Sequence, residues 1–543
     1  MRRLLIFSFI FWFAGTGSGQ AQQELPAALS QGLELLEKGE IQKALPLLRQ
    51  AVTLYPDSIQ AHNYYGFALG RAGHLPEAIQ EFKQALKLDP RSAEAFYNLG
   101  AALNQEGEYS AAADDLRKAL SLRPAFPEAD KELGFALARE GNVQGAILAL
   151  RRAIRGEPNM VSAHNELGLL YVQIGDQEDA LSEFQQAVAA NPDSAESHNN
   201  LGVALHQTGD LDGAITEFHR AVEIDPKFAE GLKNLAQAMR DKGNLNAALQ
   251  YFQQVAVLEP NSGKAHADLG YTLKLSDRLK EAEQELSKAV KLSPGLARAH
   301  FDLAEVLQQE GNPSAALQEY QKAVALSPGD AEFHLKLGAA LAKNQLQAAI
   351  PEFRRAIEID PNNSAAHQAL GMALRRIGDM QGAGEEFRRS QQLTAESDQH
   401  LAAVEYTNRG IADLKKGDLT GAIQELQNAV KSQPEMPEAN HYLGIALSAE
   451  GKWIEADHAF ETALKNAPTN PDIHFNFGVA LARQGRWQDA SRQYEAAIRL
   501  RPSYSGAHCK LAAALSRLGQ TERSQSELKL ARELGSCEGA GAP

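Results

Sequence analysis

Histidine is the residue type whose spacing in this chain most resembles that of a functional site. Nine of the 15 histidines recur at one place in a repeated pattern: His62, His164, His198, His266, His300, His334, His367, His474 and His508. A shared metal ion would need ring nitrogens about 3–4 Å apart and bonds of about 2 Å. Helices pack at about 8–10 Å, which is too far for equivalent residues of successive repeats to share an ion. We therefore expect packing residues, with no metal and no cofactor.

Other catalytic arrangements are absent from the sequence. It contains no GxxxxGK phosphate loop, no GxSxG nucleophile, no HExxH and no CxxC. We expect no enzyme activity. The formal net charge of −15 comes without a basic block, which argues against a nucleic-acid partner because phosphates attract clusters of Lys and Arg.

The N-terminus has the composition of a secretory signal. Arg2 and Arg3 precede an apolar run at residues 4–15, and small and polar residues lead to Ala21. We expect cleavage after Ala21 (signal 1–21), a mature charge of −17, and a periplasmic or secreted protein without membrane insertion. The alternative is an uncleaved anchor, but the run is shorter than the roughly 20 residues that a spanning helix needs.

A unit of 34 residues fills the rest of the chain. The eighth position of each of 15 units is small: Gly32, Gly66, Gly100, Gly134, Gly168, Gly202, Ala236, Gly270, Ala304, Gly338, Gly371, Gly410, Gly444, Gly478 and Ala512. Ala follows twelve positions later in 14 of the 15 units, and a large apolar residue stands four positions after that. Gly marks a turn, and Pro marks the end of most units. The pattern predicts two antiparallel helices in close contact, with large side chains facing small ones.

The unit resembles the tetratricopeptide repeat from about Leu25 to Leu534. The resemblance implies an all-α, right-handed superhelical solenoid of about 15 helix-turn-helix repeats, whose first helices line a concave face that holds an extended peptide or a partner's helix. Such repeats prefer a ring at the histidine position. The 39-residue spacing between Gly371 and Gly410 predicts a longer helix or irregular junction near 394–402. We expect blocks at 25–397 (about 11 repeats) and 403–535 (about four), then a flexible tail at 536–543.

The first helices offer a candidate partner surface. At their sixth position, Asn98, Asn200, Asn234, Asn408 and Asn476 match a ladder of Asn that grips peptide backbone in the similar repeats of the protein O-linked sugar transferase. Glu132, Glu166, Asp268, Asp302 and Lys336 depart from that ladder, and solvated Asn is the alternative. The ninth position is apolar in 13 of 15 units. Phe67, Phe135 and Tyr271 there are candidate anchors; contact with the neighbouring repeat is the alternative.

The two cysteines, Cys509 and Cys537, lie in the last unit and its tail. The start of the first helix lies beside the end of the second in an antiparallel pair, so the two thiols could meet. The sequence leaves open whether they form a disulfide or remain two free thiols. The sequence predicts a non-catalytic scaffold or adaptor that binds protein or peptide partners on its concave face. The alternative is an accessory subunit that presents substrates to a glycosyltransferase, a secretion machine or a polysaccharide-export machine.

Overall fold

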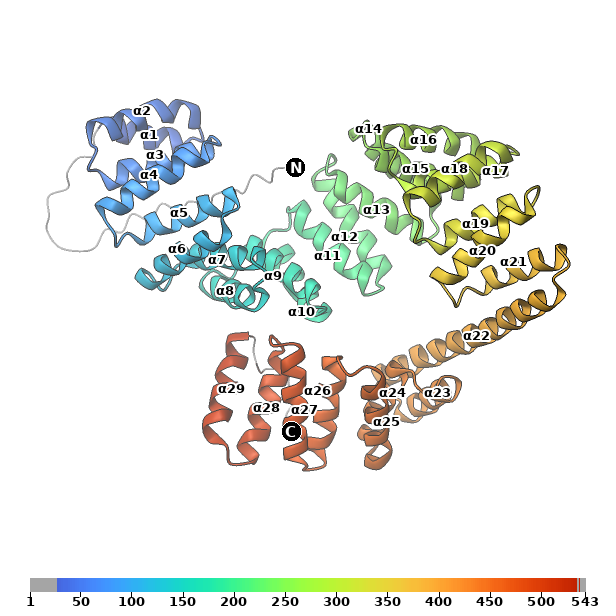
Figure 1. Ribbon diagram of the computed structural model, residues 1–543. Coiled ribbons are helices and arrows are strands. Elements are labelled where there is room, and N and C mark those ends of the chain that lie inside the picture. Colours follow the sequence, from blue (N-terminus) through green and yellow to red (C-terminus); the bar gives the residue numbers. More distant parts are fainter. Residues whose placement is uncertain (1–26, 535–536, 538–543) are drawn as a thin grey trace. The chain divides into compact units, whose positions relative to one another are not determined.

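The computed structural model describes residues 27–534 and Cys537, so the expected signal at 1–21 and all of the expected tail except Cys537 lie outside the described residues. The described residues form 29 helices and no strand, which confirms the expected all-α solenoid architecture (Figure 1). Contacts divide the chain into two compact units, Met1–Gly141 and Asn142–Pro543. Each unit is described by itself.

The helices follow one another as antiparallel hairpins. Unit 1 contains α1 (Ala27–Glu37), α2 (Ile41–Leu54), α3 (Ile59–Arg71), α4 (Leu75–Leu88), α5 (Ala93–Glu106), α6 (Tyr109–Leu122) and α7 (Pro127–Arg139). The first part of unit 2 contains α8 (Val143–Gly156), α9 (Val161–Gln173), α10 (Gln177–Ala190), α11 (Ala195–Gln207), α12 (Leu211–Ile224), α13 (Ala229–Asp241), α14 (Leu245–Leu258), α15 (Gly263–Leu275), α16 (Leu279–Leu292), α17 (Ala297–Gln309), α18 (Pro313–Leu326), α19 (Ala331–Leu341), α20 (Leu346–Ile359) and α21 (Ser364–Arg376). Its remaining helices are α22 (Met380–Lys416), α23 (Leu419–Ser432), α24 (Pro437–Glu450), α25 (Trp453–Asn466), α26 (Pro471–Arg483), α27 (Trp487–Leu500), α28 (Ser505–Arg517) and α29 (Thr521–Leu534).

Each hairpin is held by a large side chain that packs against the backbone of its partner helix. In α9, a Cβ atom added to Gly168 would lie 2.6 Å from Cε1 of Phe184 in α10, and Phe184 is only 1% exposed. In α5, a Cβ atom on Gly100 would lie 2.6 Å from Cγ of Leu116. The close approach predicted from the spacing of small and large residues is therefore present.

The turn between the helices of a repeat needs a left-handed residue. Gly73, for example, has φ of 88° between α3 and α4, a conformation that glycine adopts without steric cost. In the eighth repeat Asp277 takes the same place with φ of 58°, as the one non-glycine residue with positive φ in the part of the chain that the structure describes.

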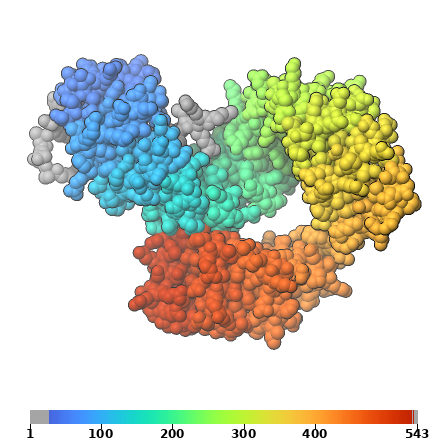
Figure 2. All heavy atoms as spheres, in the orientation of Figure 1, coloured from blue at the N-terminus to red at the C-terminus, as the bar shows by residue number. Residues whose placement is uncertain are grey.

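The break in the period is a continuous helix. α22 has 37 residues and serves both as the second helix of one repeat and as the first helix of the next. Every residue from 394 to 401 is exposed, so about two turns of the helix are solvated on all sides. The longer helix expected near 394–402 is present, and it joins the hairpin that α22 forms with α21 to the one that it forms with α23. The chain is narrow at this light-orange part of α22 in Figure 2.

Candidate partner-binding surface

The first helices of successive repeats contact one another directly. In unit 1, α3 packs against α5 and α5 against α7; in unit 2, α9, α11 and α13 do the same, and so do α24, α26 and α28. The second helices instead pack against the first helices of their own and the following repeat. Helices approach more closely on the inner side of a curved stack. The first helices therefore lie on the inner side of each unit. Their solvent-facing stripe is the inner surface of that unit.

Unit 1 carries three of the predicted site residues on this surface. Phe67 of α3 and Phe135 of α7 are half-buried. The Phe135 ring meets the edge of Tyr109 at 6.2 Å between centroids, and the Arg139 guanidinium lies 5.0 Å from its centre. Asn98 of α5 is 2% exposed, and neither Nδ2 nor Oδ1 of its amide has a hydrogen-bond partner among the described residues. Both rings are thus half-buried, whereas the Asn98 amide is enclosed.

Unit 2 carries the other three. Tyr271 of α15 is half-buried and has three cations around its ring, Arg240 at 5.2 Å, Lys274 at 4.7 Å and Arg298 at 6.0 Å from the centroid. Asn234 Nδ2 donates to Oδ1 of Asn199 in the preceding repeat at 2.8 Å. Asn200 is half-buried, and its Nδ2 has no partner within the described chain. Two members of the expected ladder are thus engaged between repeats, Asn234 and also Asn476, whose Nδ2 bonds His441 at 3.0 Å. The Nδ2 of Asn200 is buried without a partner within the described chain.

An ion-pair network beside Tyr271 was not foreseen from the sequence. Lys274 of α15 lies 2.7 Å from Asp302 and 2.8 Å from Glu305, both on α17. Lys336 of α19 reaches Glu305 at 2.9 Å, and Arg298 reaches Asp302 at 3.4 Å. These distances depend on the rotation between repeats, which the sequence does not reveal. The network joins three successive first helices across the inner surface.

Burial and charge act against one another in this network. Burial would lower the pKa of Lys274, but its bonds to Asp302 and Glu305 outweigh burial and raise it. Burial raises the pKa of Asp302 more than Lys274 lowers it. For Glu305, burial is outweighed by Lys274 and Lys336, so its pKa lies below the ordinary value. Lys274 is therefore held as a cation by the two carboxylates that it joins.

The nine recurring histidines lie in the repeats as packing residues with two hydrogen bonds each. Eight are buried, and His474 is half-buried. In every case Nε2 bonds the carbonyl oxygen of the proline six residues earlier, and Nδ1 bonds a side chain on the second helix, as His164 does with Pro158 and Glu183. No group of three or more His, Cys, Asp or Glu side chains that could hold a metal ion occurs in the described ranges. For eight of the nine this side chain is a glutamate, and for His474 it is Gln493. The sequence analysis missed these partners, although their regular spacing of 18 or 19 residues after each histidine is visible in the sequence.

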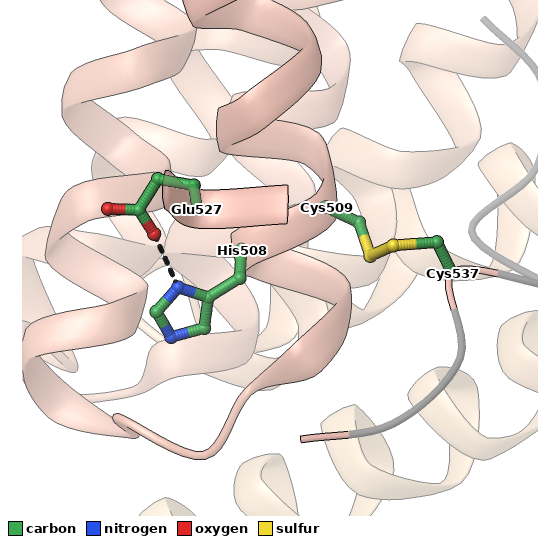
Figure 3. The surroundings of a disulfide bond; sticks show 4 residues. All are labelled: His508, Cys509, Glu527 and Cys537. Atoms are coloured by element: carbon green, nitrogen blue, oxygen red, sulfur yellow. Dashed lines mark hydrogen bonds and ion pairs between the residues drawn. A yellow bond between two sulfur atoms is a disulfide. The ribbon is translucent and has the colours of Figure 1, made fainter. Parts of the chain in front are cut away.

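The C-terminal repeat contains the two cysteines. In the structure Cys509 of α28 is bonded to Cys537, with Cα atoms 6.0 Å apart. Figure 3 shows that the adjacent residues His508 and Cys509 point in different directions, His508 toward Glu527 of α29 and Cys509 toward Cys537. The disulfide therefore ties the chain beyond α29 to the start of α28.

No helix among the described residues is both long enough and apolar enough to cross a membrane. The fold and the inner surface define a protein built wholly, over its described length, from stacked helical hairpins. The chain matches the tetratricopeptide repeat family over residues 131–184, 165–227, 276–331, 301–364, 339–398, 407–471, 443–505 and 475–536. Further repeats of this kind match at 71–105, 93–126 and 205–269. The chain belongs to the tetratricopeptide repeat family, whose fold is that of a protein-interaction scaffold.

Several solved structures are similar to this chain. TTC0263, a thermophilic TPR protein in Thermus thermophilus, is 24% identical over 34% of this chain and 100% of its own, with a TM-score of 0.30. MamA from Desulfovibrio magneticus is 23% identical over 31% of this chain and 98% of its own, with a TM-score of 0.29. The human IFIT1 dimer with PPP-AAAA is 17% identical over 69% of this chain and 92% of its own, with a TM-score of 0.35. A search of curated proteins gave no match.

Proposed function

We propose that this protein is a non-catalytic scaffold that binds a protein or peptide partner on the inner surface of its repeats. The observation that carries the proposal is the set of half-buried rings on that surface, Phe67 and Phe135 in unit 1 and Tyr271 in unit 2. Large half-buried rings are typical anchors for a partner chain, because they bury much apolar area with little loss of side-chain entropy.

The polar groups around Tyr271 suit an extended partner. The Nδ2 atom of Asn200, two repeats before Tyr271, is buried and has no partner within the described chain, so a partner's backbone could bond it only after the side chain turned outward. Of the cations near the Tyr271 ring, Lys274 and Arg298 are paired with Asp302, Glu305 and Glu332, and Arg240 lies 4.0 Å from Asp241. The surface thus has no large excess charge, and we expect the apolar contacts to determine affinity, with electrostatics contributing to orientation.

An affinity capture from envelope extract, with partners identified by mass spectrometry, tests this function. We expect Phe135→Ala and Tyr271→Ala to weaken capture of the main partner while the melting temperature stays within a few degrees. Val257→Ala is the matched control, because Val257 lies on the second helix α14 and is 79% exposed. Capture of an enzyme subunit would support the alternative role in presenting substrates.

Two outcomes of this experiment would contradict binding at the inner surface. If Phe135→Ala and Tyr271→Ala lower the melting temperature and leave capture intact, these rings serve the contact between repeats. If Val257→Ala weakens capture as much as Tyr271→Ala does, the partner uses the outer surface.

We further propose that the protein acts after export, in the periplasm or outside the cell. Two features support this location: the signal-like segment at 1–21 and the bond between Cys509 and Cys537, since disulfides persist in oxidising compartments. N-terminal sequencing of protein from the envelope should begin at Gln22. Recovery of an intact Met1 in a membrane pellet would contradict the proposal.

A further inference from the structure

Unit 2 contains a contact between its first and its last repeats that the repeat itself does not require. Helix α8, the first of the unit, contacts α29, the last. Arg501, which follows α27, is held by Asp472 of its own repeat at 3.0 Å and lies 3.7 Å from Asp176, which precedes α10. The side chains of Arg501 and Asp176 are 11% and 10% exposed. Both contacts join segments from opposite ends of the unit.

Two residues at this contact are buried at places that other repeats expose. Asp176 caps α10 and is buried. Asp210, Asp379 and Asp418 cap other second helices in the same way, and they are exposed. Ser503 follows the proline of its repeat and is 0% exposed, whereas the residue after the proline is exposed in every other repeat that ends in proline. The hairpin alone therefore does not account for this burial.

Helix α8 differs from the other second helices in its sequence as well. Leu148 stands two residues before the large apolar residue of α8, at a place that points away from the hairpin. The other fourteen repeats have Pro or a polar residue there, and all fourteen are exposed, whereas Leu148 is half-buried. Leu148 shares a helix face with Arg155, seven residues later, and Arg155 lines a cavity against α29. The outward face of α8 therefore suits a helix that is covered by α29.

The contact is loose compared with a protein core, which contains few voids. A cavity of about 490 Å³ lies between α8 and α29. The charged residues in its lining are Arg155, Lys529, Arg532 and Glu533. Cations of α8 and α29 thus face one another across the cavity. Nε of Arg501 and Oγ of Ser503 are buried without a partner among the described residues, and each such donor costs free energy. The contact can therefore open at a smaller cost than a hairpin can unfold.

We propose that this contact is a latch, which closes unit 2 head to tail in the free protein and opens to admit a folded partner to the inner surface. The first helices lie on the inner side of the stack, so closure places the inner surface of unit 2 on the inside of a closed loop. A bulky molecule then reaches that surface from the open form, and minor conformers have populations of about 0.1–10%. The role as a gate rests on the proposed function, whereas the closure does not.

The repeats themselves supply substitutions that spare the hairpins. Leu148→Arg introduces into α8 the residue that α27 carries at the same place, the exposed Arg492. Asp176→Asn keeps a cap of the kind that Asn244 provides for α14, but it removes the charge that faces Arg501. The latch variant combines both changes. We expect it to separate the two ends of unit 2, because it adds a cation opposite those of α29 and removes the anion opposite Arg501.

The matched control makes the same change of charge away from the contact. Thr216→Arg and Asp210→Asn alter the equivalent positions of the next repeat, at α12 and its cap, and both positions are exposed. We expect the control variant to behave as the wild type in both measurements below.

Closure is measured by electron–electron double resonance between spin labels on Gln177→Cys and Leu500→Cys, with the native disulfide intact. Both positions are exposed and flank the contact of Asp176 with Arg501. We expect one narrow, short distance in the otherwise wild-type protein and its loss in the latch variant. A broad distribution without a short distance in the wild-type background would overturn the proposal, and so would an unchanged short distance in a folded latch variant. Should the latch variant fail to fold, the wild-type distribution still decides whether unit 2 is closed.

Access to the inner surface is measured by the rate at which Ala339→Cys, at an exposed position of α19, reacts with biotin-maleimide. We expect the free reagent to react alike with all variants. Reagent bound to streptavidin should react about 10- to 1000-fold more slowly with the closed wild type than with the latch variant. Val257→Cys on the second helix α14, 79% exposed, should show no such difference.

Equal rates of the streptavidin-bound reagent at Ala339→Cys in the wild type and the latch variant would overturn the role as a gate. Neither measurement uses a partner, so a failure to find a partner on the inner surface would leave both results unchanged. The two proposals therefore fail separately.

Discussion

Replacing Lys274 by methionine removes the cation that two buried carboxylates share, while the methionine keeps most of the apolar stem. The side chain of Lys274 is 9% exposed and that of Asp302 is 4% exposed. Glu305, the second partner, is 19% exposed. The substitution therefore leaves negative charge in a poorly hydrated place between α15 and α17.

The expected loss follows from this burial. Removing one partner of a buried ion pair costs about 3–5 kcal/mol. Arg298 still lies 3.4 Å from Asp302 and Lys336 still lies 2.9 Å from Glu305, so we expect the lower end, about 3 kcal/mol. Lys336→Met is the matched control. Its side chain is 43% exposed, and exposed pairs contribute about 0–1 kcal/mol.

Native-state hydrogen exchange of the amides in α15, α17 and α19 measures this difference, because repeat arrays open locally before they unfold globally. Lys274→Met should raise the opening constant of these helices by about 100-fold, since each 1.4 kcal/mol is a factor of about ten. Lys336→Met should change it by less than about fivefold. Equal effects of the two variants would show that burial does not determine the strength of this network.

Three further predictions concern single sites. Asp277→Gly should stabilise the eighth repeat by about 0.5–1 kcal/mol in urea unfolding, because φ of 58° strains a side chain that glycine lacks; an unchanged or lower midpoint would contradict it. His441 accepts from Asn476 Nδ2 at 3.0 Å, and burial lowers its pKa to about 4. Stability from this site is therefore lost as pH falls below about 6.5, and Asn476→Asp should move its NMR titration upward; a midpoint that stays near 4 would argue against the bond. Reduction of Cys509–Cys537, which closes a separation of 28 residues, should destabilise the last repeat by about 3 kcal/mol, and quantitative alkylation of both thiols in unreduced protein would show that they are free.

Residue spacing predicted the hairpins because the two helices of a repeat make contact through residues that are close together in the sequence. Gly168 and Phe184 stand 16 residues apart in the sequence, and their contact requires only that two helices meet at a tight turn. The long helix near 394–402 was also predictable, because five extra residues and a missing proline leave nothing to end α22. The described contacts, however, divide the chain at Gly141, a boundary that no change of composition or spacing marks.

Contacts between repeats could not be predicted from residue spacing in the same way. Whether Asn234 faces solvent or Asn199 depends on a rotation of each repeat relative to the last, and the same rotation brings Lys274 to Asp302. The glutamates paired with histidine are a different case. Glu183 follows His164 at a spacing that recurs through the chain, so the pattern is visible in the sequence, although it matches neither a metal-ligand set nor a catalytic motif.

The most direct test of the inner-surface account is the affinity of the captured partner for purified wild-type protein and two variants, measured by isothermal titration calorimetry. We predict that Tyr271→Ala weakens binding at least tenfold, as expected for a central aromatic anchor, while Val257→Ala on the outer helix α14 binds like the wild type. Unchanged affinity of a fully folded Tyr271→Ala variant, or an equal loss in both variants, would contradict the account.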